Sequence, residues 1–188
     1  MLDWLSIQAA LFQLATADLQ VFAAEHKSER FYGLFVDCNA YYGDVLLHLN
    51  TPEMLHRQAQ TYKHNIQSIG GSAISPELYA DKTIGQIEEE LRWSGGDWGY
   101  FEVNRSDEWQ KRWEPIRKSI AALAENGHSF EDAFMKMACR VLLEIEWCGV
   151  LDLLQRTDDF RTLCADRDEG IEHAARRLEA VRAEAAGS

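Results

Sequence analysis

Histidine, cysteine and carboxylate side chains are the groups in this sequence that could bind a metal ion or take part in catalysis. The chain contains six histidines and four cysteines. His56 and His64 lie in one predicted helix and are separated along it by about 12 Å, at 1.5 Å of rise per residue. The sequence has no HExxH motif and no CxxC pair. We therefore predict no metal site and no bound cofactor.

A cysteine nucleophile needs a histidine within hydrogen-bond reach. Cys38 and His48 fall on the two strands of a predicted hairpin, in a register that separates them by roughly 20 Å. The other cysteines, Cys139, Cys148 and Cys164, are predicted to lie among apolar residues, and burial raises the pKa of a thiol. We interpret the four cysteines as structural thiols rather than as nucleophiles.

The segment Arg92–Trp98 is the most unusual local feature, because it places two tryptophans and an arginine around a Gly-Gly turn. Trp and Arg dominate binding hot spots, since they bury a large area and still carry polar groups. The alternative interpretation, which we favour for the rings themselves, is core packing at the edge of a sheet. Three acidic residues precede the segment in a predicted helix. The candidate binding residues are Glu88, Glu89, Glu90, Arg92, Trp93, Asp97 and Trp98.

Charge and composition exclude several classes of ligand. The net charge is −12 and the pI is about 4.9, which works against binding a nucleic-acid backbone. The glycine pairs Gly70-Gly71 and Gly95-Gly96 lack the frames of phosphate-binding loops and are interpreted as turns. No uninterrupted apolar stretch approaches a membrane span, and the first residues lack the basic flank of a secretory signal. We expect a soluble cytoplasmic protein that binds neither nucleic acid nor membrane.

The spacing of apolar residues predicts the helices that would position these groups. We expect helices over residues 2–26, 51–68, 84–91, 106–126, 130–154 and 171–185. The helix over 130–154 is apolar almost all round, so it is predicted to be the buried centre of the fold. The helix over 171–185 is charged with a narrow apolar stripe, and we expect it to be peripheral or to dock on a partner.

Runs of β-branched and aromatic residues predict a hairpin over 31–38 and 42–49. A three-residue loop, Asn39–Tyr41, would place Tyr32 opposite His48. Two further strands are expected, over 98–103 and 160–165. The predicted fold class is α+β: a single domain over residues 1–188, with a small, mostly antiparallel sheet packed against several helices.

Several short motifs occur in an order that resembles a known family. They are Phe22–His26, Glu29–Leu34, Leu49–Glu53, Arg92-Trp93 with Asp97-Trp98 and Tyr100, and a final strand ending at Asp166. On these motifs the chain resembles the bacterial domain-of-unknown-function family numbered forty-three oh three, from about residue 5 to residue 170. The resemblance implies a single α+β domain with no established catalytic residues, so no active site is carried over. Small acidic families of this kind are similar in habit to the immunity proteins encoded beside bacterial toxins.

These observations favour an acidic binding protein with a basic protein partner, such as an immunity protein that neutralises a cationic toxin. An excess of negative charge accelerates encounter with a basic surface. Two alternatives remain open. One is an enzyme with a site between a helix and the hairpin face that carries Tyr32, Asp44 and His48. The other is a homo-oligomeric structural protein that uses the helix over 171–185 or the Trp-rich helix beginning at Ser106 as its contact.

Overall fold

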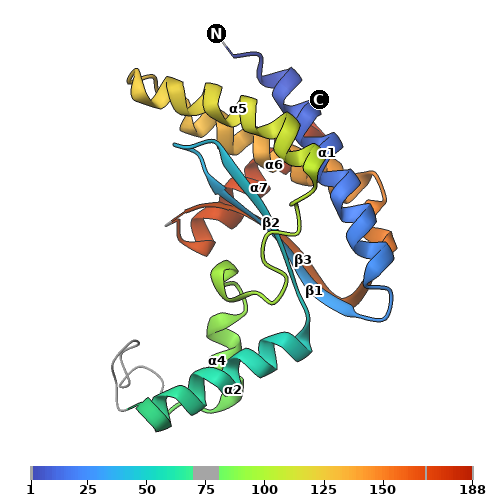
Figure 1. Ribbon diagram of the computed structural model, residues 1–188, viewed down its shortest axis with the longest axis vertical. Coiled ribbons are helices and arrows are strands. Elements are labelled where there is room, and N and C mark those ends of the chain that lie inside the picture. Colours follow the sequence, from blue (N-terminus) through green and yellow to red (C-terminus); the bar gives the residue numbers. More distant parts are fainter. Residues whose placement is uncertain (1, 70–80, 168, 188) are drawn as a thin grey trace.

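The computed structural model describes residues 2–69, 81–167 and 169–187, and Figure 1 shows their arrangement. The helices are α1 (Trp4–Glu25), α2 (Pro52–Ile69), α4 (Ile84–Leu91), α5 (Asp107–Glu125), α6 (Glu131–Trp147) and α7 (Ile171–Ala186), with 3₁₀ turns η1 (Gly95–Asp97) and η2 (Val150–Leu153). The strands are β1 (Arg30–Asn39), β2 (Asp44–Asn50) and β3 (Gln155–Asp166). The predicted turn at Gly70-Gly71 lies outside the described residues.

The strands form a three-stranded sheet in the order β2-β1-β3. β1 and β2 form the predicted antiparallel hairpin, whereas β3 returns after four of the helices to pair with β1 in parallel. The α+β class is therefore confirmed, and the sheet is mixed rather than mostly antiparallel. Because β1 and β3 run in the same direction, their carboxyl ends meet at one edge of the sheet.

The hairpin forms in a different register from the one predicted. Phe35, not Tyr32, lies opposite His48, because the loop runs from Ala40 to Gly43: it begins one residue later than expected and contains one residue more. Its last residue, Gly43, has a φ of +69°, a conformation that suits glycine. The alternation of apolar residues could not reveal this shift, because both faces of the hairpin are covered and both are therefore apolar.

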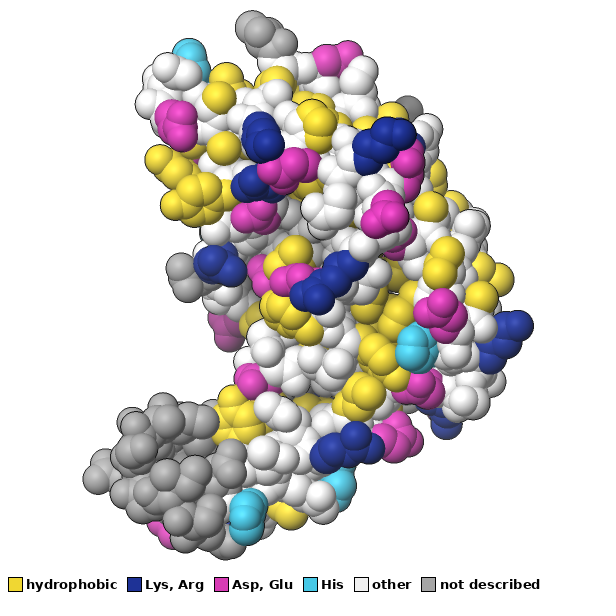
Figure 2. Space-filling view, viewed as in Figure 1, with side chains coloured by type: hydrophobic (Ala, Val, Ile, Leu, Met, Phe, Trp, Pro, Cys, Tyr) yellow, Lys and Arg dark blue, Asp and Glu magenta, His cyan; other side chains and the backbone are white. Residues whose placement is uncertain are grey.

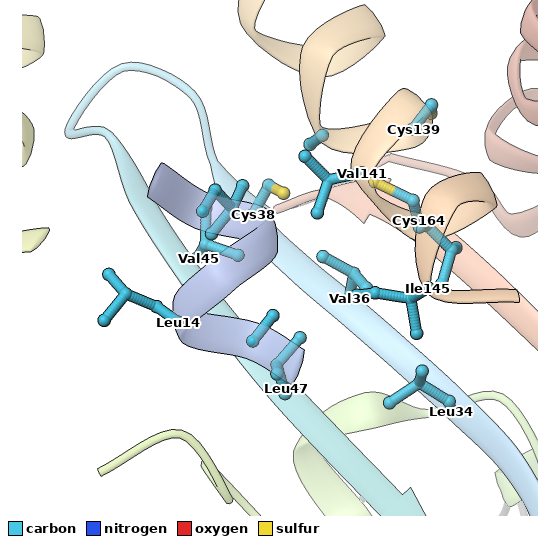
Figure 3. Packing of buried hydrophobic residues seen from close by; sticks show 14 of the residues in the cluster. Leu14, Leu34, Val36, Cys38, Val45, Leu47, Cys139, Val141, Ile145 and Cys164 are labelled. Atoms are coloured by element: carbon cyan, nitrogen blue, oxygen red, sulfur yellow. The ribbon is translucent and has the colours of Figure 1, made fainter. Parts of the chain in front are cut away.

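One face of the sheet packs on α1, α5 and α6, and Figure 3 shows part of this core. Leu34 and Val36 of β1 point into it together with Leu47 of β2, which the register places opposite Val36. The other face packs on α2, α4 and α7 through Tyr32 and Phe35. The sheet is thus the middle layer between two sets of helices, which is why the alternation of apolar and polar residues in β1 is weak.

The strand expected over 98–103 is replaced by a bulged segment beside the outer edge of β2. Leu49 and Tyr100 exchange backbone hydrogen bonds, and the Val103 amide donates to the Leu47 carbonyl at 2.8 Å. Glu102 between them has a φ of 53°. A non-glycine residue in this left-handed region interrupts regular pairing, so only an isolated bridge forms.

The predicted central helix is confirmed in position but is shorter than expected. It ends at Trp147, because Gly149 takes a φ of 81° and turns the chain into η2. The interpretation of Cys148 as a buried member of the central stripe is wrong, since its side chain is exposed beyond this helix end. Trp147 is also largely exposed.

The two terminal helices both contribute to the core. Among the described residues, α1 is the one helix long and apolar enough to cross a membrane, and Leu11, Leu14 and Leu19 on it are buried in the protein. α7 buries Leu178 and Val181, so its narrow stripe is used within the chain. Trp109 and Trp113, in the Trp-rich helix α5, are buried as well. A contact between copies would therefore need other residues of these helices. Ala174 of α7 is also buried.

Candidate functional site

The candidate binding residues Arg92 and Trp98 are hydrogen-bonded to each other on the face of the sheet that packs on α2, α4 and α7. The Arg92 carbonyl accepts hydrogen bonds from the Tyr32 hydroxyl at 3.0 Å and from Trp98 Nε1 at 3.1 Å. The Arg92 guanidinium lies 4.6 Å from the centre of the Tyr32 ring and forms an ion pair with Asp159. Trp98 is buried against Phe35 and Tyr32. The structure thus brings these two residues together as packing elements.

Asp97 is also used within the fold. Its carboxylate accepts hydrogen bonds from the Tyr62 hydroxyl of α2 at 2.7 Å and from Ser94 Oγ at 2.7 Å. Trp93 is half-buried and lines a groove of about 560 Å³ between β3, α6 and α7. Of the Arg92–Trp98 segment, Trp93 is therefore the residue whose ring borders open space.

The acidic run in α4 is divided between ion pairs and solvent. Glu88 lies 2.5 Å from His56 Nδ1 of α2, and Glu90 lies 2.6 Å from Lys82 Nζ. Glu89 is exposed. Within the described residues, no group of three or more His, Cys, Asp or Glu side chains is arranged to hold a metal ion. The role of these acids in binding remains a prediction.

A different set of acidic residues surrounds a pocket at the carboxyl ends of β1 and β3. Asp37 comes from β1, Asp44 from the start of β2, and Glu102 from the bulged segment beside β2. Arg167, which directly follows β3, lines the same pocket. The pocket has a volume of about 300 Å³, and we call it the carboxyl-end pocket. Ligands of parallel sheets commonly bind at this edge, where loops leave room between the strand ends.

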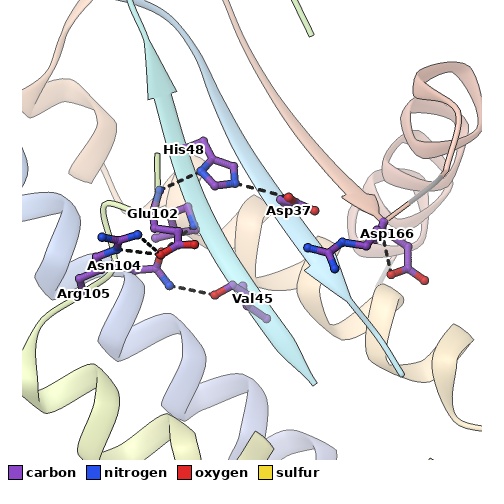
Figure 4. Close-up of polar contacts among 9 residues, drawn as sticks. Asp37, Val45, His48, Glu102, Asn104, Arg105 and Asp166 are labelled. Atoms are coloured by element: carbon purple, nitrogen blue, oxygen red, sulfur yellow. Dashed lines mark hydrogen bonds and ion pairs between the residues drawn. The ribbon is translucent and has the colours of Figure 1, made fainter. Parts of the chain in front are cut away.

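His48 lies between two residues that line the carboxyl-end pocket, Asp37 and Glu102, and Figure 4 shows its contacts with both. Its Nδ1 accepts a hydrogen bond from the Glu102 amide at 2.9 Å, and its Nε2 lies 3.5 Å from Asp37 Oδ2. Because Nδ1 is an acceptor, the proton of the neutral imidazole is on Nε2 and faces Asp37. The His48 side chain is 0% exposed and stacks on Phe101 at a ring distance of 4.4 Å.

The bulge that supplies Glu102 is fixed by an asparagine that replaces a strand partner. Asn104 Oδ1 accepts from the Leu47 amide at 2.7 Å, and its Nδ2 donates to the Val45 carbonyl at 2.9 Å (Figure 4). The Asn104 side chain is buried, so these bonds are made in a dry environment that strengthens them. Asn104 therefore holds the strained Glu102 backbone against His48.

Charges around the carboxyl-end pocket differ in how they are paired. Asp44 lies 3.5 Å from Arg117, and Glu102 forms an ion pair with Arg105. Burial raises the pKa of Asp44 above its usual value, in spite of the lowering effect of Arg117. Among the ion pairs of the described residues, the one that involves Asp37 is with neutral His48. Asp37 is thus the pocket carboxylate without an arginine or lysine partner.

Three of the four cysteines lie together in the core: Cys38 on β1, Cys139 on α6 and Cys164 on β3 (Figure 3). A hydrogen bond with Cys164 and burial raise the pKa of Cys139 well above the usual value of a thiol. Such thiols stay protonated and are poor nucleophiles. The interpretation of these three as structural thiols agrees with their surroundings.

Sequence reasoning missed most of the carboxyl-end pocket. One signal was available: Asp37 is a charged residue between Val36 and Cys38 in an apolar strand, and such a residue is rarely placed there without a use. Glu102 gave no signal, because its position depends on a bulge. Of the hairpin-face residues Tyr32, Asp44 and His48, the structure places Asp44 in the lining of this pocket and His48 next to the lining residue Asp37.

Comparison of the chain with protein-family models, with curated proteins and with solved structures finds no match. The resemblance to the family numbered forty-three oh three therefore remains a prediction from the short motifs. The function has to be argued from the geometry of the chain.

Proposed function

We propose that this chain is a cytoplasmic binding protein for a basic protein partner, in the manner of an immunity protein that neutralises a cationic toxin. The observation that supports the proposal most directly is the carboxyl-end pocket, where Asp37, Asp44 and Glu102 face one small cavity. A concave site with several carboxylates focuses negative potential and attracts cationic groups.

The surface around the carboxyl-end pocket has the aromatic residues of a binding site. Phe101 is 43% exposed and covers His48 beside Glu102. Tyr41 and Tyr42 are about half exposed in the loop between Asn39 and Asp44, which both line the pocket. Exposed aromatic rings next to charged groups are typical of the centres of protein interfaces.

The distribution of charge elsewhere makes this pocket stand out. Figure 2 shows acidic and basic side chains interspersed over one face of the molecule, with hydrophobic side chains exposed among them. Such mixing weakens long-range attraction, because neighbouring charges of opposite sign cancel beyond a Debye length. The net charge of −12 assists encounter, while the local cluster of carboxylates supplies the specific contact.

The geometry gives less support to the alternative of an enzyme that uses His48. The His48 ring is fully buried, and its two nitrogens face the Glu102 amide and Asp37. A general acid or base has to reach a proton of the substrate. In this arrangement the His48 ring is enclosed behind Asp37 and Glu102 and does not itself meet a substrate.

The proposal is tested with the tagged full chain as bait in a native lysate at low salt, followed by kinetics with the purified captured protein. We expect a basic protein whose association rate falls at least about tenfold between low and high ionic strength. The double variant Asp37→Asn with Glu102→Gln should no longer bind this basic protein. A matched control, Glu88→Gln with Glu89→Gln, removes the same charge from α4.

Capture of a protein from the lysate does not by itself support the proposal. The proposal is wrong if the association rate is independent of salt, or if the pocket variant binds the partner as tightly as the wild type does. Loss of binding in the α4 control but not in the pocket variant would move the contact to Glu88 and Glu89, the residues first chosen from the sequence.

A further inference from the structure

We infer that the carboxyl-end pocket binds a guanidinium group, so that the basic partner inserts one arginine side chain beside Asp37. This inference deepens the proposed function and rests on it for the source of the arginine. The pocket itself, and its preference for a guanidinium, can be tested without the partner.

The first argument is the availability of Asp37. Asp44 and Glu102 are paired with Arg117 and Arg105, whereas Asp37 has no such partner among the described residues. The Asp37 side chain is 22% exposed and lines the cavity. An incoming cation can therefore bond Asp37 without first breaking an ion pair, and the two flanking carboxylates add attraction.

The second argument is an unused donor next to Asp37. His48 Nε2 is buried and has no hydrogen-bond partner, and its distance of 3.5 Å from Asp37 Oδ2 is too long for a good hydrogen bond. A buried donor left unpaired is unfavourable. A shift of the Asp37 carboxylate by roughly half an ångström would complete this bond, and a ligand that holds the carboxylate in place would make the shift favourable.

The third argument concerns the shape of the cation. A guanidinium is planar and presents a fork of N–H donors, so it can bond both oxygens of a carboxylate and still reach a second acidic group. A cavity of about 300 Å³ accommodates one such side chain but not a folded segment. Arg167 lines the same cavity, so its positive charge opposes part of the attraction that the three carboxylates exert on an incoming guanidinium.

The test titrates the full chain with Nα-acetyl-argininamide at low ionic strength and follows the Glu102 amide and the His48 Nε2–H by NMR. We expect saturable shifts of both signals, and protection of Nε2–H from exchange as its bond to Asp37 forms. Nα-acetyl-citrullinamide has nearly the same shape without the charge and should bind at least about tenfold more weakly. Nα-acetyl-lysinamide should fall between the two.

Asp37→Asn keeps the size of the side chain and should weaken argininamide binding at least about tenfold. Asp158→Asn is the matched control, because it removes one exposed carboxylate of β3 outside the pocket, and its affinity should stay within about twofold of the wild type. If Asp37→Asn fails to fold, Glu102→Gln replaces it, with an expected loss of several-fold.

The inference is overturned if argininamide and citrullinamide shift the same signals equally, if no saturable shift occurs, or if Asp37→Asn binds as the wild type does. Failure with argininamide, together with a salt-dependent partner that requires the pocket carboxylates, would reject the arginine and leave the proposed function standing. If argininamide binds but no basic partner is found, the guanidinium site stands and the proposed function is rejected.

Discussion

In the Arg92–Trp98 segment, polar and aromatic groups bond to one another: the Arg92 carbonyl accepts from Tyr32 and Trp98, and Asp97 accepts from Tyr62. In the carboxyl-end pocket, Asp37 has no arginine or lysine partner among the described residues, and the His48 Nε2 donor is unpaired. The first region attracts attention by its composition, but its groups are used in packing. Availability of polar groups, rather than rarity of residue types, separates a binding surface from a structural one.

The largest expected effect is on the first region. Trp98→Ala should lower the free energy of unfolding by about 4 kcal/mol, because it opens a cavity between Phe35 and Tyr32 in a tightly packed cluster. Urea unfolding monitored by circular dichroism measures the loss. Trp147→Ala, which removes an exposed tryptophan, should cost less than about 1 kcal/mol. Equal losses in the two variants would contradict the structural role of Trp98.

The second prediction concerns Glu169, a carboxylate near the pocket that is ion-paired within the fold, in contrast to Asp37. Glu169 is 8% exposed and is ion-paired with Arg177. Burial raises its pKa, but Arg177 and the Asp166 amide outweigh burial and hold the pKa below the usual value. A lowered folded-state pKa means that the stabilisation is present above the unfolded pKa and is lost as the pH falls through the folded one.

Glu169→Gln should therefore destabilise the protein by about 3 kcal/mol at neutral pH. The difference from the wild type should shrink as the pH falls below the usual glutamate pKa of 4.5. Urea unfolding of both proteins at neutral pH and in acid measures this difference in the free energy of unfolding. Glu172→Gln, an exposed change three residues further along in the first turn of α7, is the control and should have little effect at either pH. A pH-independent loss for Glu169→Gln would mean that shape, not charge, is responsible.

The third prediction sharpens the role of the Gly-Gly turn. A Cβ on Gly95 would collide with the Phe35 ring, whereas a Cβ on Gly96 would meet nothing within 4 Å. Gly95→Ala should lower stability by about 2 kcal/mol through overpacking. Gly96→Ala should change it by less than about 0.5 kcal/mol. Thermal melts of the two variants make the comparison, and a neutral Gly95→Ala would show that the turn can move away from the sheet.

The smallest stability effect is expected at Asp37. Asp37→Asn should change the free energy of unfolding by no more than about 0.5 kcal/mol, because no cation depends on this carboxylate among the described residues. The same change should abolish the binding of a basic partner. A loss comparable to that of Trp98→Ala would make Asp37 a structural residue and would remove the contrast between the two regions.

Local signals predicted much of the fold. Thr51-Pro52 marks the start of α2, where Thr51 Oγ1 accepts from the Met54 amide at 3.1 Å. Ser106 caps α5 by accepting from the Trp109 amide at 3.1 Å. Such signals depend on residues three or four apart, and the backbone groups at a helix end need a partner wherever the helix lies.

The pocket could not be predicted in the same way. Its position depends on the hairpin register, on the bulge at Glu102 and on the parallel pairing of β1 with β3. Both faces of the hairpin are buried, so the hydrophobic pattern satisfies more than one register. The favoured binding segment was chosen by residue type, and whether its groups are free depends on contacts between distant parts of the chain.

The sequence alone determined the helices, the presence of the hairpin, the α+β class and the acidity of the chain, because these follow from local periodicity, capping and composition. Only the tertiary structure decided that Asp37, Asp44 and Glu102 share one pocket and that His48 lies behind it. Residues far apart in the chain meet where the packing of the whole core is most favourable, and no local pattern contains that information.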